Sequence, residues 1–398
     1  MSKALARRLI VSLLLFSLAA SPVRGEDQEL PAETPFPLLE GLEKAVEFWI
    51  KIFTVYTTTQ VVLFDAEDPA TIYKVLELPI DRAAREAIKT ERRALAAALE
   101  IDEHRVRGQR GIKERFVEGL VRSRRYLGQM QQIFRDHGLP VELAYLPLVE
   151  SSFNIQARSS AGAVGMWQFI RSTGRRFLRI DRHIDERKDP IESTRAAALF
   201  LKENYEALGS WPLAITAYNH GAEGVARGVE QVGSNNLVDL IRLYESRTWG
   251  FASKNFYAEF LAALHVAQNR ERYFPGLEPD APLSLQEIAL EKPTPVHALL
   301  KSAGVPLARF LEWNPALSAR IAVLPRGYRV KISGEKFAPA QPVREPVEQA
   351  MLRHKVKRGE TLYQIARRYE ASVEEIAEAN GLKKTRLLNI GQVLIIPR

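Results

Sequence analysis

The stretch AYLPLVESSF, Ala144–Phe153, places one carboxylate, Glu150, directly behind an apolar run. Leu143, Leu146 and Val149 recur around the turn that delivers it. Burial among such residues disfavours the charged form of a carboxyl group and raises its pKa, so Glu150 could remain protonated and act as a general acid. Enzymes that cleave sugar chains usually use two carboxylates. Taken alone, however, a glutamate before serine is typical of a surface residue that closes a helix.

A second group of residues follows within twenty positions of Glu150. The segment SSAGAVGMWQF, 159–169, carries Gly162 and Gly165, which would let the backbone approach a ligand closely. Trp167 and Phe169 offer flat apolar faces that can stack on sugar rings. This composition favours a carbohydrate ligand.

A third group, ITAYNHG at 215–221, combines Tyr218, Asn219 and a glycine at the end of a helix. Neutral hydrogen-bonding groups of this kind suit hydroxyls and acetamides better than phosphates or metals. His220 has no second histidine or carboxylate at ligand spacing, so we expect a structural or surface role for it and no metal site.

These motifs carry a resemblance. Glu150-Ser151, then GMWQ, then AYNHG, in this order and at these intervals, resemble the three motifs of the soluble-lytic-transglycosylase (SLT) catalytic domain across roughly residues 129–268. The resemblance implies a lysozyme-like, mostly helical fold that acts on peptidoglycan, with no cofactor. It also implies cleavage of the β-1,4 bond between N-acetylmuramic acid and N-acetylglucosamine by a single glutamate. No nearby Asp or Glu has a spacing that demands a second catalytic role.

In such a reaction Glu150 would protonate the leaving oxygen and then take the proton from the muramyl C6 hydroxyl, giving a 1,6-anhydro product. An internal hydroxyl has a large effective concentration compared with water, which favours ring closure. By the resemblance, Ser159 would lie near the muramyl acetamide, Gln168 would bind a sugar, and Met166 would line the cleft. The full set of substrate-binding residues would be Ser151, Ser159, Met166, Gln168, Tyr218, Asn219 and Tyr257.

The fourth SLT motif departs from the pattern. That motif usually offers a tyrosine facing the glutamate, in a context like RNY, but SKNFY places Phe256 at this position and Tyr257 one residue later. One residue turns a helix by about 100°, so Tyr257 cannot simply replace it.

The segment 353–398 resembles a LysM module, whose βααβ fold binds N-acetylglucosamine-containing chains. The resemblance places seven residues at or near the sugar: Gly359, Glu360, Thr361, Leu362, Asn380, Gly381 and Leu382. From 352 to 398 the sequence has ten Lys or Arg against five Glu, a local charge of +5 within a net charge of +8. A basic surface suits anionic wall polymers, and without a nucleic-acid recognition motif we expect no nucleic-acid partner.

The elements that must position these residues are mainly helical. Periodicity predicts helices at 38–56, 81–103 and 109–137 and a short strand at 59–65. KDPIEST predicts a helix start with Asp189 as cap and Pro190 at the first position, ending near Gly209. Further helices are expected at 211–219 and 253–269. Residues 305–332 and 371–397 share one pattern, a short helix ending in asparagine followed by a strand.

The N-terminus has a basic start, an apolar run at 9–20 and a small-residue exit, which is typical of a secretory signal peptide. A buried N-terminal helix is the alternative. We expect cleavage after Gly25, or else after Ala20, and an exported, periplasmic or cell-envelope protein. The sequence has no cysteine, so we expect no lipid anchor. Separately, we expect a monomer.

The expected fold class is mainly α: a lysozyme-like helical catalytic domain with small βααβ modules. The expected regions are a signal peptide at 1–25, a mostly helical region at 26–137, the SLT domain at 138–275, a degenerate LysM-like domain at 285–332, a Pro-rich linker at 333–351 and a LysM domain at 352–398. Two alternatives stay open: a hydrolytic muramidase, in which water replaces the C6 hydroxyl, and a catalytically silent peptidoglycan-binding scaffold.

Overall fold

The computed structural model describes residues 34–333, 352–357, 360–369, 371–382, 388–389 and 391–396. The expected signal peptide, Gly359 and nearly all of the expected linker therefore lie outside the described residues. The chain divides after Pro37, and the fold below is that of Leu38–Arg398. Among the described helices, none is both long and apolar enough to span a membrane.

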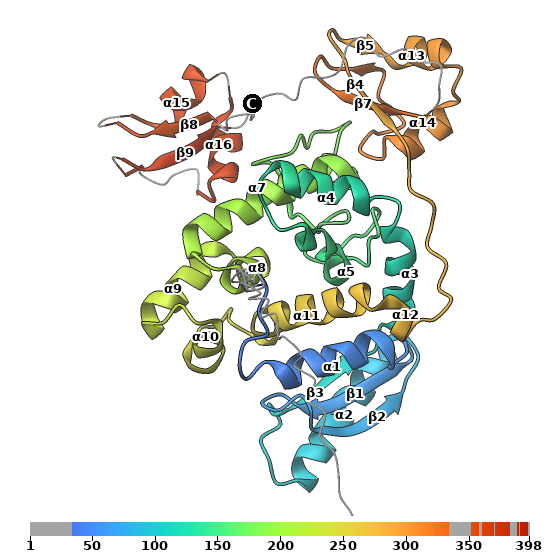
Figure 1. The fold of residues 1–398 in the computed structure, drawn as a ribbon. Helices are drawn as coiled ribbons and strands as arrows, with labels where there is room; N and C mark the ends of the chain where they lie inside the picture. The colour runs from blue at the N-terminus through green and yellow to red at the C-terminus, as the bar shows by residue number, and fades with distance from the viewer. Residues whose placement is uncertain are drawn as a thin grey trace, which may run out of the picture. The chain divides into compact units, whose positions relative to one another are not determined.

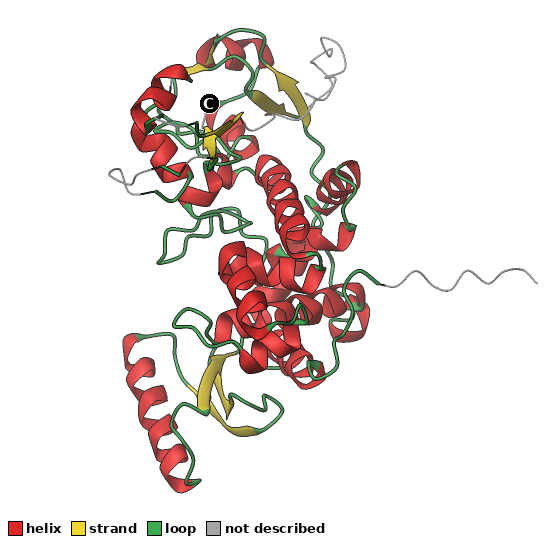
Figure 2. Cartoon of the chain, turned by 90° about the vertical axis from the view of Figure 1, so that its left-hand side faces the viewer, coloured by secondary structure: helices red, strands yellow, loops and turns green. Residues whose placement is uncertain are grey.

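Helices dominate the fold, and the strands form only small antiparallel sheets (Figure 2). The expected mainly α fold class is confirmed. The helices are α1 (Glu43–Thr54), α2 (Arg82–Ala98), α3 (Lys113–Ser123), α4 (Leu127–Asp136), η1 (Val141–Tyr145), α5 (Pro147–Glu150), α6 (Arg171–Gly174), η2 (Glu186–Lys188), α7 (Pro190–Leu208), α8 (Trp211–His220), α9 (Ala222–Val232), α10 (Leu237–Leu243), α11 (Phe251–Gln268), α12 (Arg270–Tyr273), α13 (Val296–Ala303), α14 (Leu307–Trp313), α15 (Leu362–Arg368) and α16 (Val373–Ala379). The strands are β1 (Gln60–Asp65), β2 (Ile72–Glu77), β3 (Val106–Arg110), β4 (Gln286–Ala289), β5 (Thr294–Pro295), β6 (Val323–Leu324), β7 (Arg329–Ile332), β8 (Leu352–Lys355) and β9 (Val393–Ile396).

A three-stranded sheet in the order β2-β1-β3 lies in the N-terminal region. The strand β1 was expected, but β2 and β3 were not, and β3 takes up the start of the helix expected at 109–137. Val61 to Phe64 of β1 are all buried, so this strand forms the sheet's apolar centre. Helix α1 connects this N-terminal region to the helical domain by packing on α11 (Figure 1). There Trp49 Nε1 donates to Asn255 Oδ1 at 3.2 Å.

The helical domain is organised around α7 and α11. Asp189 caps α7 by accepting from the backbone N–H groups of Ile191 and Glu192, both at 3.0 Å, with Pro190 at the first helical position as expected. Helix α11 is buried along most of its length and packs against α1, α8 and α5 (Figure 1). Because α5 ends at Glu150, this packing places α11 next to the candidate acid.

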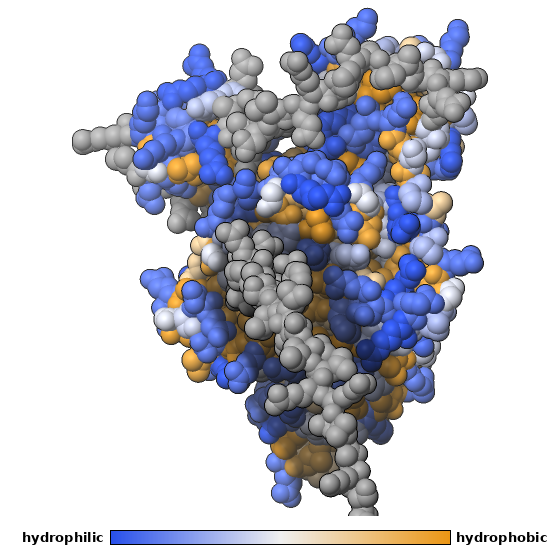
Figure 3. Space-filling view, in the orientation of Figure 1, coloured by the Kyte–Doolittle hydropathy of each residue, from blue (hydrophilic) through white to orange (hydrophobic). Residues whose placement is uncertain are grey.

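Two small modules follow, and in each a pair of helices comes between two paired strands; the first also contains the short pair β5 and β6. In the first, β4 pairs antiparallel with β7 around α13 and α14, and in the second, β8 pairs with β9 around α15 and α16. Each has an apolar core, and that of the first module includes Ile184 of the helical domain. Hydrophilic residues cover much of the surface seen in Figure 3, since most large apolar side chains lie in these cores and in the helical domain.

Candidate active site

Glu150 is the last residue of the single-turn helix α5. Leu143 and Leu146 are fully buried, as the apolar pattern predicted, and so is Leu148, whereas Val149 is only half-buried. The chain then turns sharply, because Ser152 and Phe153 adopt left-handed φ angles of 51° and 57°. Residues other than glycine rarely adopt such angles. Such strain concentrates at functional sites, where the surrounding structure fixes the backbone.

Two hydrogen bonds from Arg122 hold this turn in place. Its Nε and Nη2 donate to the carbonyl oxygen of Ser152 at 3.1 and 2.8 Å. Ser151, which follows the acid, donates from Oγ to the carbonyl oxygen of Met166 at 2.7 Å. The turn that presents Glu150 is thereby fixed from both sides.

The pKa of Glu150 is raised to about 8, first by burial and second by the negative charge of Glu259. The raised pKa expected from the apolar setting is confirmed, and the carboxyl group is protonated at neutral pH. Among the described residues no cation pairs with it. A carboxyl group that keeps its proton near neutral pH has the property that a general acid requires.

Glu259 is a residue that the sequence reasoning missed. It lies on α11, which packs against α5, and burial raises its pKa to about 8 as well. The sequence analysis considered only the spacing of carboxylates along the chain, so it did not place Glu259 beside Glu150. The two acids are 109 positions apart, so no motif spacing links them, and only the acidic residue within the apolar run YAEFLAA could have signalled this.

The loop 159–169 closes on itself through backbone and side-chain bonds. Ser159 Oγ accepts from the N–H of Ala163 at 3.0 Å, while Gln168, at a left-handed φ of 50°, donates from Nε2 to the carbonyl oxygen of Gly165 at 2.8 Å. Ser159 is exposed and Gln168 half-buried, so both can reach a ligand. Met166 is fully buried, so the side chain expected to line the cleft faces the core.

Two further expectations for this loop need correction. Trp167 and Phe169 are buried, and Trp167 Nε1 donates to Thr194 Oγ1 at 2.9 Å, so these rings pack inside the domain instead of stacking on sugars. Gly165 approaches protein, not ligand: at its φ of 82° an added Cβ would collide with the carbonyl oxygen of Arg187.

Tyr218 on α8 joins the third motif to the second. Its hydroxyl donates to the carbonyl oxygen of Trp167 at 2.7 Å. Burial raises its pKa well above the ordinary value, and the charge of Glu150 adds to this, which places the phenol near the acid. The three motifs therefore converge on one site.

The two residues after Tyr218 lie at the end of α8. Asn219 is exposed, and its Oδ1 accepts from Ser253 Oγ at 3.5 Å. His220 bonds to Ser253 through Nδ1 at 2.9 Å, and its ring lies edge-on to Trp249. Its pKa is lowered, mainly by burial. These contacts agree with a structural role, and in residues 34–333 no group of three His, Asp or Glu is arranged to hold a metal.

In the fourth motif, Phe256 and Tyr257 are both buried in α11, with exposed fractions of 4% and 1%. Burial raises the pKa of Tyr257 above its usual range. Since its side chain does not reach solvent, the expected substrate-binding role of Tyr257 is not supported. Successive residues of this helix are both covered because α11 is packed on several sides.

In the C-terminal module most of the expected glycan-binding side chains serve the fold. Glu360 accepts from His354 Nε2 at 2.6 Å and Arg368 Nη1 at 2.7 Å, and its pKa falls to about 2, chiefly through its bond with the N–H of Lys357. The other residues are built in differently: Thr361 caps α15, Leu362 is buried, Asn380 binds the backbone of β9, Gly381 has a left-handed φ, and Leu382 packs on the core. Sugar contact through these positions stays a prediction.

Comparison with known proteins agrees with the motifs. Residues 131–239 match the model of the transglycosylase SLT domain, and residues 354–397 match that of the LysM domain. Membrane-bound lytic murein transglycosylase D of Escherichia coli K12 is 26% identical over 295 residues, 69% of this chain and 64% of that protein. The chain thus spans just under two thirds of the length of this relative.

Two other similar proteins cover shorter stretches. A protein of Alteromonas sp. strain M-1, named for tributyltin chloride resistance, is 36% identical over 129 residues, 32% of this chain and 62% of that protein. An inactive mutant of the lytic transglycosylase Slt from Pseudomonas aeruginosa aligns with a TM-score of 0.31 and 18% identity, over 38% of this chain and 24% of that one. The chain contains an SLT domain and a LysM domain, as the sequence predicted.

Proposed function

We propose that this chain is a lytic murein transglycosylase that cleaves the β-1,4 bond between N-acetylmuramic acid and N-acetylglucosamine in peptidoglycan. The observation that carries the proposal is Glu150, a partly buried carboxyl group with a pKa of about 8, where the three SLT motifs meet. A group of that pKa holds a proton at neutral pH and can give it to the leaving oxygen.

The proposed reaction uses this one carboxyl group twice, first as an acid and then as a base. Glu150 donates it to the glycosidic oxygen as the bond to the muramyl C1 breaks. The resulting carboxylate then takes the proton of the C6 hydroxyl while that oxygen bonds to C1, which closes the 1,6-anhydro ring and restores the acid. The substrate's own acetamide stabilises the intermediate, with Tyr218 and Asn219 orienting the acid or the acetamide.

Hydrolysis is the second candidate, and Glu259 is the observation in its favour. Glycosidases that use water carry a second carboxylate to activate it. A half-buried glutamate coupled to Glu150 by charge could serve as that base. Its raised pKa argues against this role at neutral pH, since a protonated carboxyl group cannot accept a proton.

Digestion of purified sacculi with wild type and Glu150→Gln, followed by mass spectrometry of the soluble fragments, tests the proposal. Anhydro products are about 18 Da lighter than hydrolytic ones, because no water is added. We expect only anhydro products from the wild type and at least a 10³-fold loss with Glu150→Gln, since general acid catalysis contributes up to about 10⁴-fold. Products with a reducing end would support the muramidase. Binding of peptidoglycan without release of soluble fragments would support the catalytically silent scaffold.

The supporting parts fit an exported wall enzyme. The LysM domain would hold N-acetylglucosamine-containing strands, and tethering a weak binder to a catalytic domain raises the local substrate concentration. Export to the periplasm or cell envelope is proposed on the signal-like N-terminus and the murein-acting relative.

A further inference from the structure

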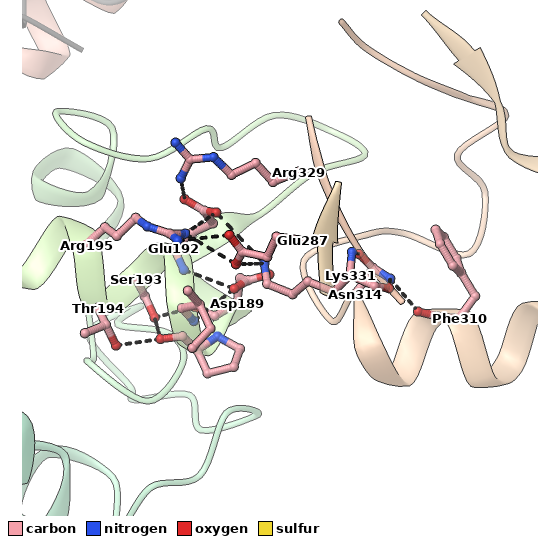
Figure 4. A network of polar contacts seen from close by, with 12 residues as sticks. Asp189, Glu192, Ser193, Thr194, Arg195, Glu287, Phe310, Asn314, Arg329 and Lys331 are labelled. Atoms are coloured by element: carbon pink, nitrogen blue, oxygen red, sulfur yellow. Dashed lines mark hydrogen bonds and ion pairs between the residues drawn. The ribbon is translucent and has the colours of Figure 1, made fainter. Parts of the chain in front are cut away.

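A buried lysine joins the 285–332 module to the helical domain (Figure 4). Lys331 on β7 is 2% exposed, and its Nζ lies 2.6 Å from Oδ2 of Asp189, which is 1% exposed. Glu287 and Glu192 follow at 3.7 and 3.9 Å. Burial alone would lower the pKa of Lys331, but the acids more than offset this and raise it. The cation therefore stays charged inside the interface.

Comparison of the two modules shows that this lysine serves the interface. Asn314 bonds both to the N–H of Lys331 at 2.9 Å and to its carbonyl oxygen at 2.8 Å, and Asn380 makes the same pair of bonds to Ile395, at 2.8 and 2.7 Å. Lys331 and Ile395 are thus equivalent positions. The module fold does not require a cation here, since an apolar residue occupies the same place in the second copy.

The backbones of the two parts also pair directly. Residues 183–185 and 316–318 form an antiparallel bridge and two hydrogen bonds of 2.8 Å. Ile184, which comes from the helical domain, is 2% exposed and belongs to the apolar core of the module. A core that includes a residue of the neighbouring domain is a sign of a fixed contact.

The segment 181–189, which includes residues 183–185, also contacts the loop 159–169 of the candidate active site. Arg187, paired with Asp185 at 2.9 Å, donates from Nη1 to the carbonyl oxygens of Gly162 and Phe169, both at 3.2 Å. Gly165 packs directly on the Arg187 carbonyl. The segment 181–189 thus lies between the module on one side and the loop 159–169 on the other.

We propose that the 285–332 module is a fixed brace of the catalytic domain, and that Lys331 is the positioning residue that locks it onto segment 181–189 and so holds loop 159–169 in shape. The proposal rests on the proposed function only in assigning substrate contacts to that loop. It gives this copy of the module a role in shaping the site, distinct from glycan capture by the C-terminal copy.

The first experiment compares three full-length variants by hydrogen–deuterium exchange and by kinetics on a soluble glycan. Lys331→Met leaves Asp189 buried without its cation, so amide exchange in loop 159–169 should become at least tenfold faster and kcat/KM should fall by a similar factor. Lys331→Arg keeps the charge, so its amide exchange in loop 159–169 and its kcat/KM should both be close to those of the wild type. Lys301→Met removes an exposed lysine of the same module and should behave as wild type.

Two results would overturn the brace: unchanged exchange in a folded Lys331→Met, or equal damage from Lys301→Met. A variant that only unfolds in part would lower the amount of active enzyme without changing KM, so a changed KM separates positioning from simple destabilisation.

A second experiment applies even where Lys331→Met folds poorly. A protease site inserted after Gly276, which is exposed, allows the folded wild-type chain to be cut between the two parts. The fragments should stay together in gel filtration at physiological salt, and their separation would refute the brace. Exchange and co-elution need no turnover, so a wild type that yields no anhydro product would refute the proposed function alone.

Discussion

At the scale of single residues, the acidity of Glu150 is set by two helices. Helix α5 supplies the apolar enclosure, and α11 supplies the like charge of Glu259. Two carboxyl groups that share a partly buried site cannot both ionise readily, because the second negative charge meets the first. Near neutral pH the pair therefore keeps protons that isolated glutamates would have lost.

Glu259→Gln should lower the pH at which activity is lost. Donation requires the protonated acid, so kcat is highest below the pKa of Glu150 and falls as pH rises through about 8. Without the charge of Glu259 that pKa decreases, and the fall should move down on the order of one pH unit. A pH–rate profile measures the shift. Glu206→Gln, at an exposed site on α7, serves as control; an unmoved profile in Glu259→Gln would mean that the two acids do not interact.

Gly165→Ala should destabilise the protein far more than Gly162→Ala. Both glycines have φ near 80°, but an added Cβ meets nothing within 4 Å at Gly162 and collides with the backbone of Arg187 at Gly165. The left-handed backbone costs about 1–2 kcal/mol at either site. The collision should bring the loss at Gly165 to roughly 2–5 kcal/mol. Urea unfolding of both variants measures the difference, and equal losses would contradict the contact.

What the sequence reveals at this scale depends on distance along the chain. Glu150, Gln168 and Tyr218 stand in motifs that resemble those of the SLT domain, so the resemblance implied that they meet. Glu259 reaches the site only through the packing of α11 on α5, which no short pattern encodes. Trp167 was misjudged for a related reason: an aromatic ring looks the same in a sequence whether it faces a ligand or the core.

At the scale of elements, predictions succeeded where capping and periodicity agree. Asp189 and Pro190 mark the start of α7, and Gly209 its end. The strands β2 and β3 were missed because their residues are mostly exposed or half-buried and rich in charge, so that IYKVLE and VRGQR lack a clear apolar alternation. Only β1, buried over five of its six residues, carries a strong signal.

Asn380→Ala should weaken the attachment of β9, the last strand of the C-terminal module, to α16. Its side chain bonds to the N–H and carbonyl oxygen of Ile395, tying the end of α16 to β9. Losing both bonds should cost about 1–3 kcal/mol, because the strand keeps its unpaired backbone groups. Hydrogen exchange of 393–396 measures the loss, and Asn389→Ala, at an exposed position, is the control. Equal protection in both variants would show that the clamp is dispensable.

At the scale of the whole molecule, the two small modules share two helices between a pair of antiparallel strands, but their proposed roles differ. The first is docked through Lys331 and shares its core with Ile184. The second carries the basic surplus of the C-terminal segment and matches the LysM model. The repeat could be recognised from its pattern of a short helix that ends in asparagine and is followed by a strand. The different roles of the two modules could not be predicted, because they depend on which module surface the helical domain covers.

Two truncations should separate these roles. Removing the chain after Ser333 deletes the LysM domain alone, so activity on sacculi should fall at least about tenfold through lost local concentration, while activity on short soluble glycans is retained. Removing the chain after Phe274 also deletes the brace, so activity should fall on both substrates because loop 159–169 loses its support. Rates of fragment release on the two substrates measure the contrast. Full activity of the shorter protein on soluble glycans would show that the first module only spaces the second from the catalytic domain.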